Sequence, residues 1–262
     1  MLDEHSKLSP NSKFKFSCHK GLSCFGQCCG DVNIFLTPYD VLRMKKVLNL
    51  SSEDFLEKYT LPLLLEEQGI PVVLLKMGND ANKKCPFVTP DGCMIYEDRP
   101  WACRMYPLGL ASSKTDDAGE QFCFIAEQGS FCQGFKEDKE WTVEEWLRDQ
   151  KVDDFNKKSD AYMQFTLHKH FQEGKGIEPS KVKMFYEACY DLDQFRSHLF
   201  ESKFFSLFEL ESDFIEKLKT DDEELLSFGI NWLRFALFGE NTVKVKDEVW
   251  KQRENELGLN NT

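Results

Sequence analysis

The sequence predicts an α+β fold that is mostly α, with a small cysteine-rich module followed by a helical region. Of ten cysteines, only Cys189 lies outside residues 18–132, and the other nine stand there among glycines, prolines and short apolar runs. From residue 142 onward, apolar side chains recur at helical spacing, and many of the 23 phenylalanines fall in this part. We therefore expect a cysteine-rich module over residues 1–140 and a helical region over residues 141–262.

Short elements are predicted at the start of the chain. Residues 32–36 (Val-Asn-Ile-Phe-Leu) are typical of a short strand. Residues 37–48 begin with Thr-Pro-Tyr-Asp, which supplies an N-cap, a proline at the first helical position and an acid in the first turn. A second short helix is expected over 51–59. The Val- and Leu-rich residues 70–77, followed by Gly-Asn-Asp, predict a strand that ends in a turn.

The middle of the chain is expected to be mostly loop. Residues 80–112 carry three cysteines and four prolines, which indicates loop with a hairpin. An acidic loop is predicted over 112–120, and residues 121–126 are expected to form a last short strand.

Long helices are predicted in the second half. The capping-box sequence Thr-Val-Glu-Glu opens an expected helix over 142–171, which the glycines at 174–176 end. A Pro-Ser start and helically spaced apolar residues predict a second helix over 179–199. A third is expected over 220–238, with a glycine directly after it. The polar tail after residue 241 is left open between a final helix and loose chain.

Composition and charge exclude several classes of protein. Lysine and arginine total 33 against 45 aspartate and glutamate, so the formal charge is −12, which argues against nucleic-acid binding. No uncharged apolar run approaches the roughly 18 residues of a membrane span. The first ten residues lack the apolar core of a secretory signal, so we expect a cytoplasmic location. A protein partner is left open.

The clustered cysteines are the main functional signal. In a reducing cytosol, clustered thiols are more often metal ligands or redox groups than disulfides. The first cluster places four thiols within twelve residues with glycines between them, which suits a loop folded around a cation. Its members are Cys18, Cys24, Cys28 and Cys29. The second cluster follows later in the chain with Cys85, Cys93 and Cys103, and then Cys123 and Cys132.

The spacing of these cysteines does not choose the metal. Tetrahedral zinc and a cubane iron–sulfur cluster each commonly take four thiolates, so nine cysteines would fill two sites and leave one over. Paired C-x2-C zinc knuckles and the ferredoxin run C-x2-C-x2-C are absent. A radical-SAM signature that starts at Cys24 is rejected, because Asp31 occupies its third position. The vicinal pair of Cys28 and Cys29 is easier to place if the two thiols serve different irons or different sites.

Two arginines flank the third cysteine region. Arg99 and Arg104 would offset the negative charge of four thiolates around a cubane and hydrogen-bond its sulfur. The alternative is that both arginines pair with Glu97, Asp98 or other carboxylates.

These motifs resemble the YkgJ-type cysteine-cluster family, whose CxxCxxCC domain is described as zinc- or iron-chelating. The matching residues are Phe16-x-Cys18, Cys24, Cys28-Cys29, Leu36-Thr37-Pro38-x-Asp40, Cys85-Pro86-Phe87, Gly92-Cys93-x-Ile95-Tyr96-Glu97-x-Arg99-Pro100-x-x-Cys103-Arg104-x-Tyr106-Pro107 and Cys132-x-Gly134. The resemblance covers about residues 14–150 and implies a metal-binding role. One departure is the wider first spacing, Cys18-x5-Cys24 in place of a C-x2-C start.

The other titratable candidates are weaker. Cys123 is left open between a ligand and a core residue, whereas Cys189 stands on the apolar stripe of a helix and is expected to pack in the core. His19 is expected to be an exposed side chain. His168 and His170, two apart on a predicted helix, are expected to point to different faces, which argues against joint ligation.

The sequence thus favours a cytosolic metal-binding protein. The expected ligands are Cys18, Cys24, Cys28, Cys29, Cys85, Cys93, Cys103 and Cys132. An iron–sulfur cluster of the [4Fe-4S] type is favoured over zinc, in a structural, electron-transfer or redox-sensing role. The alternative is an S-adenosylmethionine-dependent protein lysine N-methylase, because the flagellin lysine N-methylases carry a similar motif. No glycine-rich nucleotide loop supports that alternative, and the sequence identifies no catalytic or cofactor-binding residue.

Overall fold

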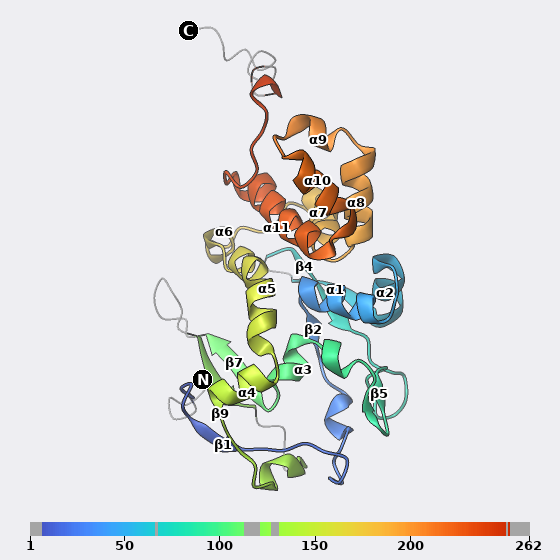
Figure 1. The fold of residues 1–262 in the computed structure, drawn as a ribbon, viewed down its shortest axis with the longest axis vertical. Coiled ribbons are helices and arrows are strands. Elements are labelled where there is room, and N and C mark those ends of the chain that lie inside the picture. Colours follow the sequence, from blue (N-terminus) through green and yellow to red (C-terminus); the bar gives the residue numbers. More distant parts are fainter. Residues whose placement is uncertain (1–6, 66–67, 113–120, 127–130, 250, 252–262) are drawn as a thin grey trace. The chain divides into compact units, whose positions relative to one another are not determined.

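The computed structural model of the chain describes residues 7–65, 68–112, 121–126, 131–249 and 251 (Figure 1). Helices predominate over short strands, which confirms the predicted α+β, mostly α class. The chain divides into two compact units. Unit 1 comprises Met1–Leu36 and Leu74–Lys158, and unit 2 comprises Thr37–Val73 and Ser159–Thr262. The domain division expected between residues 1–140 and 141–262 stays a prediction.

Unit 1 is built from short strands, short 3-10 helices and the helices α3, α4 and the first part of α5. Its strands pair antiparallel as β1 with β9, β5 with β6, and β7 with β8. The elements are β1 (Lys13–Lys15), η2 (Gln27–Cys29), β2 (Phe35–Leu36), β5 (Val88–Thr89), β6 (Gly92–Cys93), η3 (Tyr96–Asp98), α3 (Trp101–Met105), β7 (Leu108–Ser112), β8 (Gln121–Ile125), η4 (Gln133–Lys136), β9 (Glu140–Thr142), α4 (Val143–Asp149) and α5 (Val152–Thr166), which continues past residue 158.

An aromatic core organises unit 1. Phe16 is buried and meets three rings edge to face, with centroid distances of 5.7 Å to Tyr106, 5.2 Å to Phe135 and 5.6 Å to Trp146. The indole N–H of Trp146 in turn donates to the Met105 carbonyl at 3.2 Å. Because Phe16 lies two residues before Cys18, this core fixes the start of the first cysteine loop.

Unit 2 is mainly helical. Thr37 caps its first helix as predicted, because its hydroxyl accepts the Asp40 N–H at 3.1 Å while the Asp40 carboxylate accepts the Thr37 N–H at 2.9 Å. β3 neighbours β4 in the sheet. The elements are α1 (Pro38–Val47), α2 (Ser52–Tyr59), β3 (Thr60–Leu65), β4 (Ile70–Leu75), α6 (Lys169–Gln172), α7 (Pro179–Cys189), α8 (Leu192–Glu201), α9 (Phe204–Leu207), α10 (Ser212–Thr220) and α11 (Asp222–Phe238).

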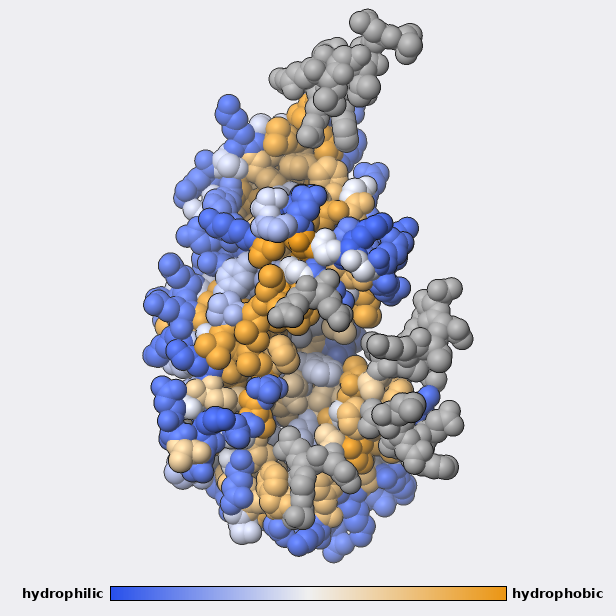
Figure 2. Space-filling model, turned by 180° about the vertical axis from the view of Figure 1, so that it is seen from behind, coloured by the Kyte–Doolittle hydropathy of each residue, from blue (hydrophilic) through white to orange (hydrophobic). Residues whose placement is uncertain are grey.

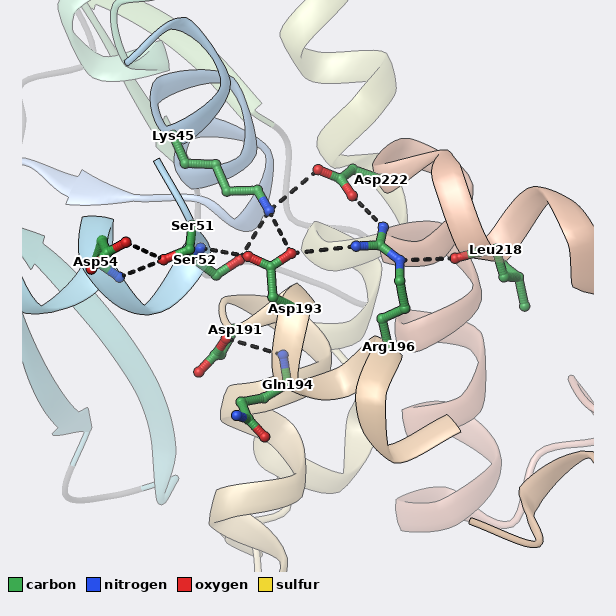
Figure 3. A network of polar contacts seen from close by, with 10 residues as sticks. All are labelled: Lys45, Ser51, Ser52, Asp54, Asp191, Asp193, Gln194, Arg196, Leu218 and Asp222. Atoms are coloured by element: carbon green, nitrogen blue, oxygen red, sulfur yellow. Dashed lines mark hydrogen bonds and ion pairs between the residues drawn. The ribbon is translucent and has the colours of Figure 1, made fainter. Parts of the chain in front are cut away.

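A charged network joins helices within unit 2 (Figure 3). The ammonium of Lys45 is buried and lies 3.2 Å from the Asp193 carboxylate and 3.3 Å from that of Asp222. It also donates to the Ser52 hydroxyl at 3.0 Å. Arg196 pairs with both carboxylates, so two cations and two anions compensate one another between α1, α2, α8 and α11.

Some predicted elements differ from the structure. The helix expected over 142–171 is broken into α4, α5 and α6, and Lys151 adopts a left-handed φ of 56° at the first break. The helix expected over 179–199 is interrupted at Asp191, whose side chain caps α8. The strand expected over 32–36 is shortened to β2. Most of the predicted acidic loop and most of the polar tail lie outside the described residues.

On the face drawn in Figure 2, hydrophobic residues are exposed in patches between hydrophilic ones. Within the described ranges, no helix combines the length and the apolar character that crossing a membrane requires.

Candidate metal centre

The eight cysteines predicted as ligands all belong to unit 1. They come from four parts of the chain: the loop that ends in η2, the β5–β6 hairpin with its approach, helix α3, and the residue before η4. All ten cysteines of the chain are free thiols. Backbone hydrogen bonds decide which of these segments meet.

One contact joins the first cysteine loop to Cys132. The Ser17 N–H donates to the Gly134 carbonyl at 3.1 Å, so the residues beside Cys18 and Cys132 lie together. A Cβ on Gly134 would stand 2.7 Å from the Phe16 ring and 2.9 Å from the Ser17 carbonyl oxygen. Only glycine permits this approach. A second contact comes from the Gln133 N–H, which donates to the Cys24 sulfur at 3.2 Å.

The charges of neighbouring thiols in this region affect the pKa of Cys18. Packing around the Cys18 sulfur first, and then the charges of Cys28, Cys24 and Cys132, raise the pKa of Cys18 to about 11. A thiolate opposes the ionisation of another thiol in this way only when the two sulfurs are near neighbours. We call Cys18, Cys24, Cys28 and Cys132 the first group.

Tyr106 belongs to the surroundings of the first group. Its hydroxyl is buried and has no hydrogen-bond partner in the described part of the chain. Burial, and then interaction with the Cys132 thiol and the charges of Cys28 and Cys18, raise the pKa of Tyr106. A buried hydroxyl without an acceptor is costly, so its position beside sulfur points to an acceptor there. Tyr106 is part of the sequence motif, but no role was predicted for it.

A different backbone contact brings Cys29 to Cys85. The Cys85 N–H donates to the Cys29 carbonyl at 2.7 Å, and Gly30 forms an antiparallel bridge with Lys84. A Cβ on Gly30 would stand 2.7 Å from the Asn82 carbonyl oxygen, so this close pairing also requires glycine.

The β5–β6 hairpin adds Cys93 to this pair. The Val88 N–H donates to the Cys85 carbonyl at 3.2 Å, and Val88 is the register partner of Cys93 across the hairpin. Gly92 adopts a φ of 115° before Cys93, a conformation that favours glycine.

The last member of this set is Cys103 on α3. The pKa of Cys29 is raised by its hydrogen bond with Cys28, by burial, and then by the charges of Cys28, Cys103 and Cys85. The charge of Cys93 likewise raises the pKa of the Cys85 thiol. We call Cys29, Cys85, Cys93 and Cys103 the second group.

Backbone donors point at several sulfurs. Burial raises the pKa of Cys85, while the N–H groups of Phe87 and Val88 oppose that rise. Burial also raises the pKa of Cys93, and the Ile95 N–H and the charge of Arg99 oppose it. Hydrogen bonds of this kind favour the thiolate, which is the form that binds metal. Together with Cys24, each group thus contains at least one sulfur that accepts a backbone hydrogen bond.

The two arginines differ in their surroundings. The Arg99 guanidinium stacks 3.8 Å over the Tyr96 ring and donates to the Tyr96 carbonyl and the Gln150 side chain. Its charge reaches Cys93, which agrees with the expected compensation of thiolate charge. Arg104 is buried and donates to the carbonyls of Arg99, Gln150 and Glu97, so it braces the backbone between Cys93 and Cys103.

The remaining cysteines lie elsewhere. Cys123 on β8 packs against the aromatic core of unit 1, and burial alone raises its pKa. Cys189 is 1% exposed at the end of α7, which confirms the prediction that it is a core residue.

The histidines have other partners. His19 is exposed as predicted, and its ring contacts Glu137 at 3.1 Å and the Gly21 N–H at 3.1 Å. His168 contacts Glu240 at 3.1 Å, and His170 contacts the Gly176 carbonyl at 3.2 Å. The break before α6 separates them from the long helix on which they were expected.

The donor set can be tested against a metal. Across the described ranges, no three His, Cys, Asp or Glu side chains lie close enough together to hold one metal ion. The chemistry of the eight thiols nevertheless fits a thiophilic metal or cluster, because sulfur is concentrated here with N–H donors, an unsatisfied hydroxyl and a guanidinium around it. A [4Fe-4S] cluster would bind each of four thiolates through a different iron.

The fold and the sulfur-rich site define a small cysteine-rich domain within a longer chain. Residues 17–133 match the model of the CxxCxxCC family, described as "Putative zinc- or iron-chelating domain". This match confirms the resemblance predicted from the motifs and spans all eight candidate cysteines. Comparison with curated proteins and with solved structures found no match.

Proposed function

We propose that this protein holds an iron–sulfur cluster of the [4Fe-4S] type through its clustered cysteines. The observation that carries the proposal is that eight cysteines from segments far apart in sequence all lie in unit 1, with backbone N–H donors on Cys24, Cys85 and Cys93. Such donors and the charge of Arg99 offset the negative charge that thiolate-bound clusters carry. The role is structural, electron-transferring or redox-sensing.

The proposal extends the zinc- or iron-chelating description of residues 17–133 by naming the cofactor. It is tested by anaerobic purification followed by a visible spectrum and by analysis of iron, acid-labile sulfide and zinc. The expected result is a brown protein with broad visible absorption and about four iron and four sulfide per cluster. A colourless protein that holds stoichiometric zinc would overturn the cluster assignment.

Two further expectations stand beside this proposal. A cytoplasmic location is supported by ten free thiols, because a reducing compartment keeps cysteines available to metals. The lysine N-methylase alternative rests on the resemblance of the motif alone, and no feature of the described residues favours it over metal binding.

A further inference from the structure

We propose that an open groove in unit 2 binds an extended basic peptide, which adds as a strand to the free edge of β3. The groove has a volume of about 940 Å³ and is lined by residues from β3, β4 and the helices α2, α7 and α8. All of these residues belong to unit 2, whereas the cysteines of the proposed cluster belong to unit 1. The inference therefore goes beyond the proposed function and does not depend on it.

The strand β3 has a free edge and carries exposed apolar side chains. It pairs with β4 on one side, and no other strand of the described residues pairs with it. Its four leucines are between 40% and 52% exposed, although leucine is most often buried. They are Leu61, Leu63, Leu64 and Leu65. Pro62 removes a single backbone donor, so other residues of β3 can still pair with an added strand.

Apolar side chains continue from this strand into the groove. Leu63 and Leu64 line it from β3, and Pro71 lines it from β4. Val182 and Tyr186 line it from α7. When an extended peptide is added to the edge of a sheet, main-chain hydrogen bonds give affinity and neighbouring side-chain pockets give specificity. The free edge of β3 and the groove beside it supply both.

The charged side chains of the groove are mainly acidic. Glu53, Glu187 and Asp191 line it, against a single lysine, Lys183. Lys183 lies 3.6 Å from Glu187, which also contacts His198 at 2.8 Å. Within the described part of the chain, Glu53 and Asp191 form no ion pair. Lysine or arginine side chains of a bound peptide would supply the missing positive charge.

The surroundings of Asp191 show that these carboxylates lie close enough to affect one another. Burial first, and then the charges of Asp193, Glu53 and Glu187, raise the pKa of Asp191. The Gln194 N–H, which donates to the Asp191 carboxylate at 3.3 Å, opposes the rise (Figure 3). A cation beside Asp191 would reduce this repulsion. The groove therefore favours a basic peptide over a neutral or acidic one.

The same charges argue against a second copy of this chain as the occupant. A two-fold dimer places the same surface of both copies face to face, so the carboxylates of the two grooves would approach each other. Each chain also carries a formal charge of −12. We therefore assign the groove to a peptide that combines apolar side chains with lysine or arginine.

Fluorescence anisotropy with defined peptides tests the assignment on the full chain. The probe is a labelled peptide of alternating lysine and valine with the length of β3, six residues. It should bind saturably, and added salt should weaken the binding. A glutamate–valine peptide of the same length should not bind. A lysine–valine peptide with methylated backbone nitrogens should bind at least about tenfold more weakly, because it cannot donate main-chain hydrogen bonds.

Charge-neutralising variants test the acidic side of the groove. Glu53→Gln combined with Asp191→Asn should raise the Kd of the lysine–valine peptide about three- to tenfold, because two partly exposed ion pairs are lost. Glu201→Gln combined with Asp213→Asn is the matched control. Both of these acids are exposed and lie outside the groove lining, so the Kd should change little.

A variant of β3 tests the apolar side. Leu64→Lys should abolish binding, because it replaces an apolar contact with a cation that repels the peptide. Leu167→Lys is the control, because Leu167 is 54% exposed, close to the 52% of Leu64, and does not line the groove. It should leave the Kd unchanged. Circular dichroism identifies any variant that fails to fold, and the comparison of peptides needs no variant.

The possible outcomes decide the proposal without touching the metal assignment. Failure of the lysine–valine peptide to bind, or equal binding of the glutamate or methylated peptide, would overturn it. A dimer in sedimentation equilibrium that Leu64→Lys dissociates would assign the surface to a second copy and would also overturn it. Metal analysis tests the cluster separately, so neither result changes that assignment.

Discussion

The backbone N–H of Gln133 donates a 3.2 Å hydrogen bond to the sulfur of Cys24, which lies 109 positions earlier in the chain. Cys24 is buried, so its side chain has little contact with water. Because the donor is a backbone group, a substitution of Gln133 abolishes the bond only if it removes the N–H itself.

Gln133→Pro should weaken metal retention. Gln133 is the first residue of η4, where the fixed φ of proline is compatible with the backbone and the N–H is lost. Losing a hydrogen bond to a charged sulfur costs about 1.5–3 kcal/mol, so metal affinity should fall about tenfold or more. Competition with a chelator measures this. Gln133→Ala keeps the N–H and should behave like the unsubstituted protein; equal affinities for both variants would contradict the role of this bond.

Tyr106→Phe should have opposite effects on the metal-free and loaded protein. Without metal, removing a buried hydroxyl that lacks a partner should raise the free energy of unfolding by about 1 kcal/mol. With metal bound, the hydroxyl should donate to a thiolate sulfur. The increase in the free energy of unfolding on substitution should then disappear. Urea unfolding of both forms measures the difference. Tyr96→Phe is the matched control, because the Tyr96 side chain is exposed. Loss of its hydroxyl should leave the free energy of unfolding unchanged in both the metal-free and the loaded protein.

Gly30→Ala should separate Cys29 from Cys85. The added Cβ would meet the Asn82 carbonyl oxygen at 2.7 Å, and relief of that clash should cost about 1–3 kcal/mol of unfolding free energy. Metal content should fall with it. Gly21→Ala is the control in the same loop, because its Cβ meets only the His19 side chain at 3.0 Å and that side chain can move. If both variants retain full metal, the close pairing at Gly30 does not support the site.

Lys45→Met should destabilise unit 2. The substitution keeps most of the aliphatic volume but removes the buried cation between Asp193 and Asp222. We expect a loss of about 1–3 kcal/mol, below the range for fully buried pairs, because both carboxylates keep contact with water and Arg196 remains. Urea denaturation measures the loss, and Lys46→Met on the exposed side of α1 should change stability little.

Acid should release the contribution of Asp193. Burial raises its pKa, but the Ser52 N–H and Lys45 outweigh burial, so the pKa lies below the ordinary 3.8. Its stabilisation is therefore fully present above pH 3.8 and is lost as the pH falls through the lower pKa of the folded state. Asp193→Asn should flatten the fall of the urea midpoint in this range.

Asp191→Asn provides a control of opposite sign. Burial raises the pKa of Asp191, so its ionisation destabilises the folded state as the pH rises above 3.8. This variant should gain stability over that range relative to the unsubstituted protein. The same pH response in both variants would contradict the assignment.

The ligand candidates could be predicted from the sequence, but their grouping could not. Thiol density, glycines and motif spacing identify eight cysteines, and helical spacing identifies Cys189 as a core residue. The neighbours of each cysteine depend on which distant backbone segments pair, such as Ser17 with Gly134 and Cys29 with Cys85, and local spacing carries no information on this. Tyr106 was missed for the same reason.

Helix existence was easier to predict than helix continuity. The apolar spacing continues across Lys151 and Asp191, although one helix ends and another begins at each of these positions. Lys151 adopts a left-handed φ without being glycine, so no ordinary breaker residue marks the position. No element was predicted over residues 60–65, which form β3 and include Pro62; proline is tolerated on an edge strand such as β3.

The pairing of β1 with β9 sets an order of events during biosynthesis. Lys13–Lys15 can find their partners only when Glu140–Thr142 have emerged from the ribosome, and the Ser17–Gly134 contact forms in the same region. A nascent chain that has exposed only its first cysteine loop therefore offers a metal an open and incomplete set of thiols. Binding of the proposed metal should accordingly be complete only after residues 134–142 have been translated.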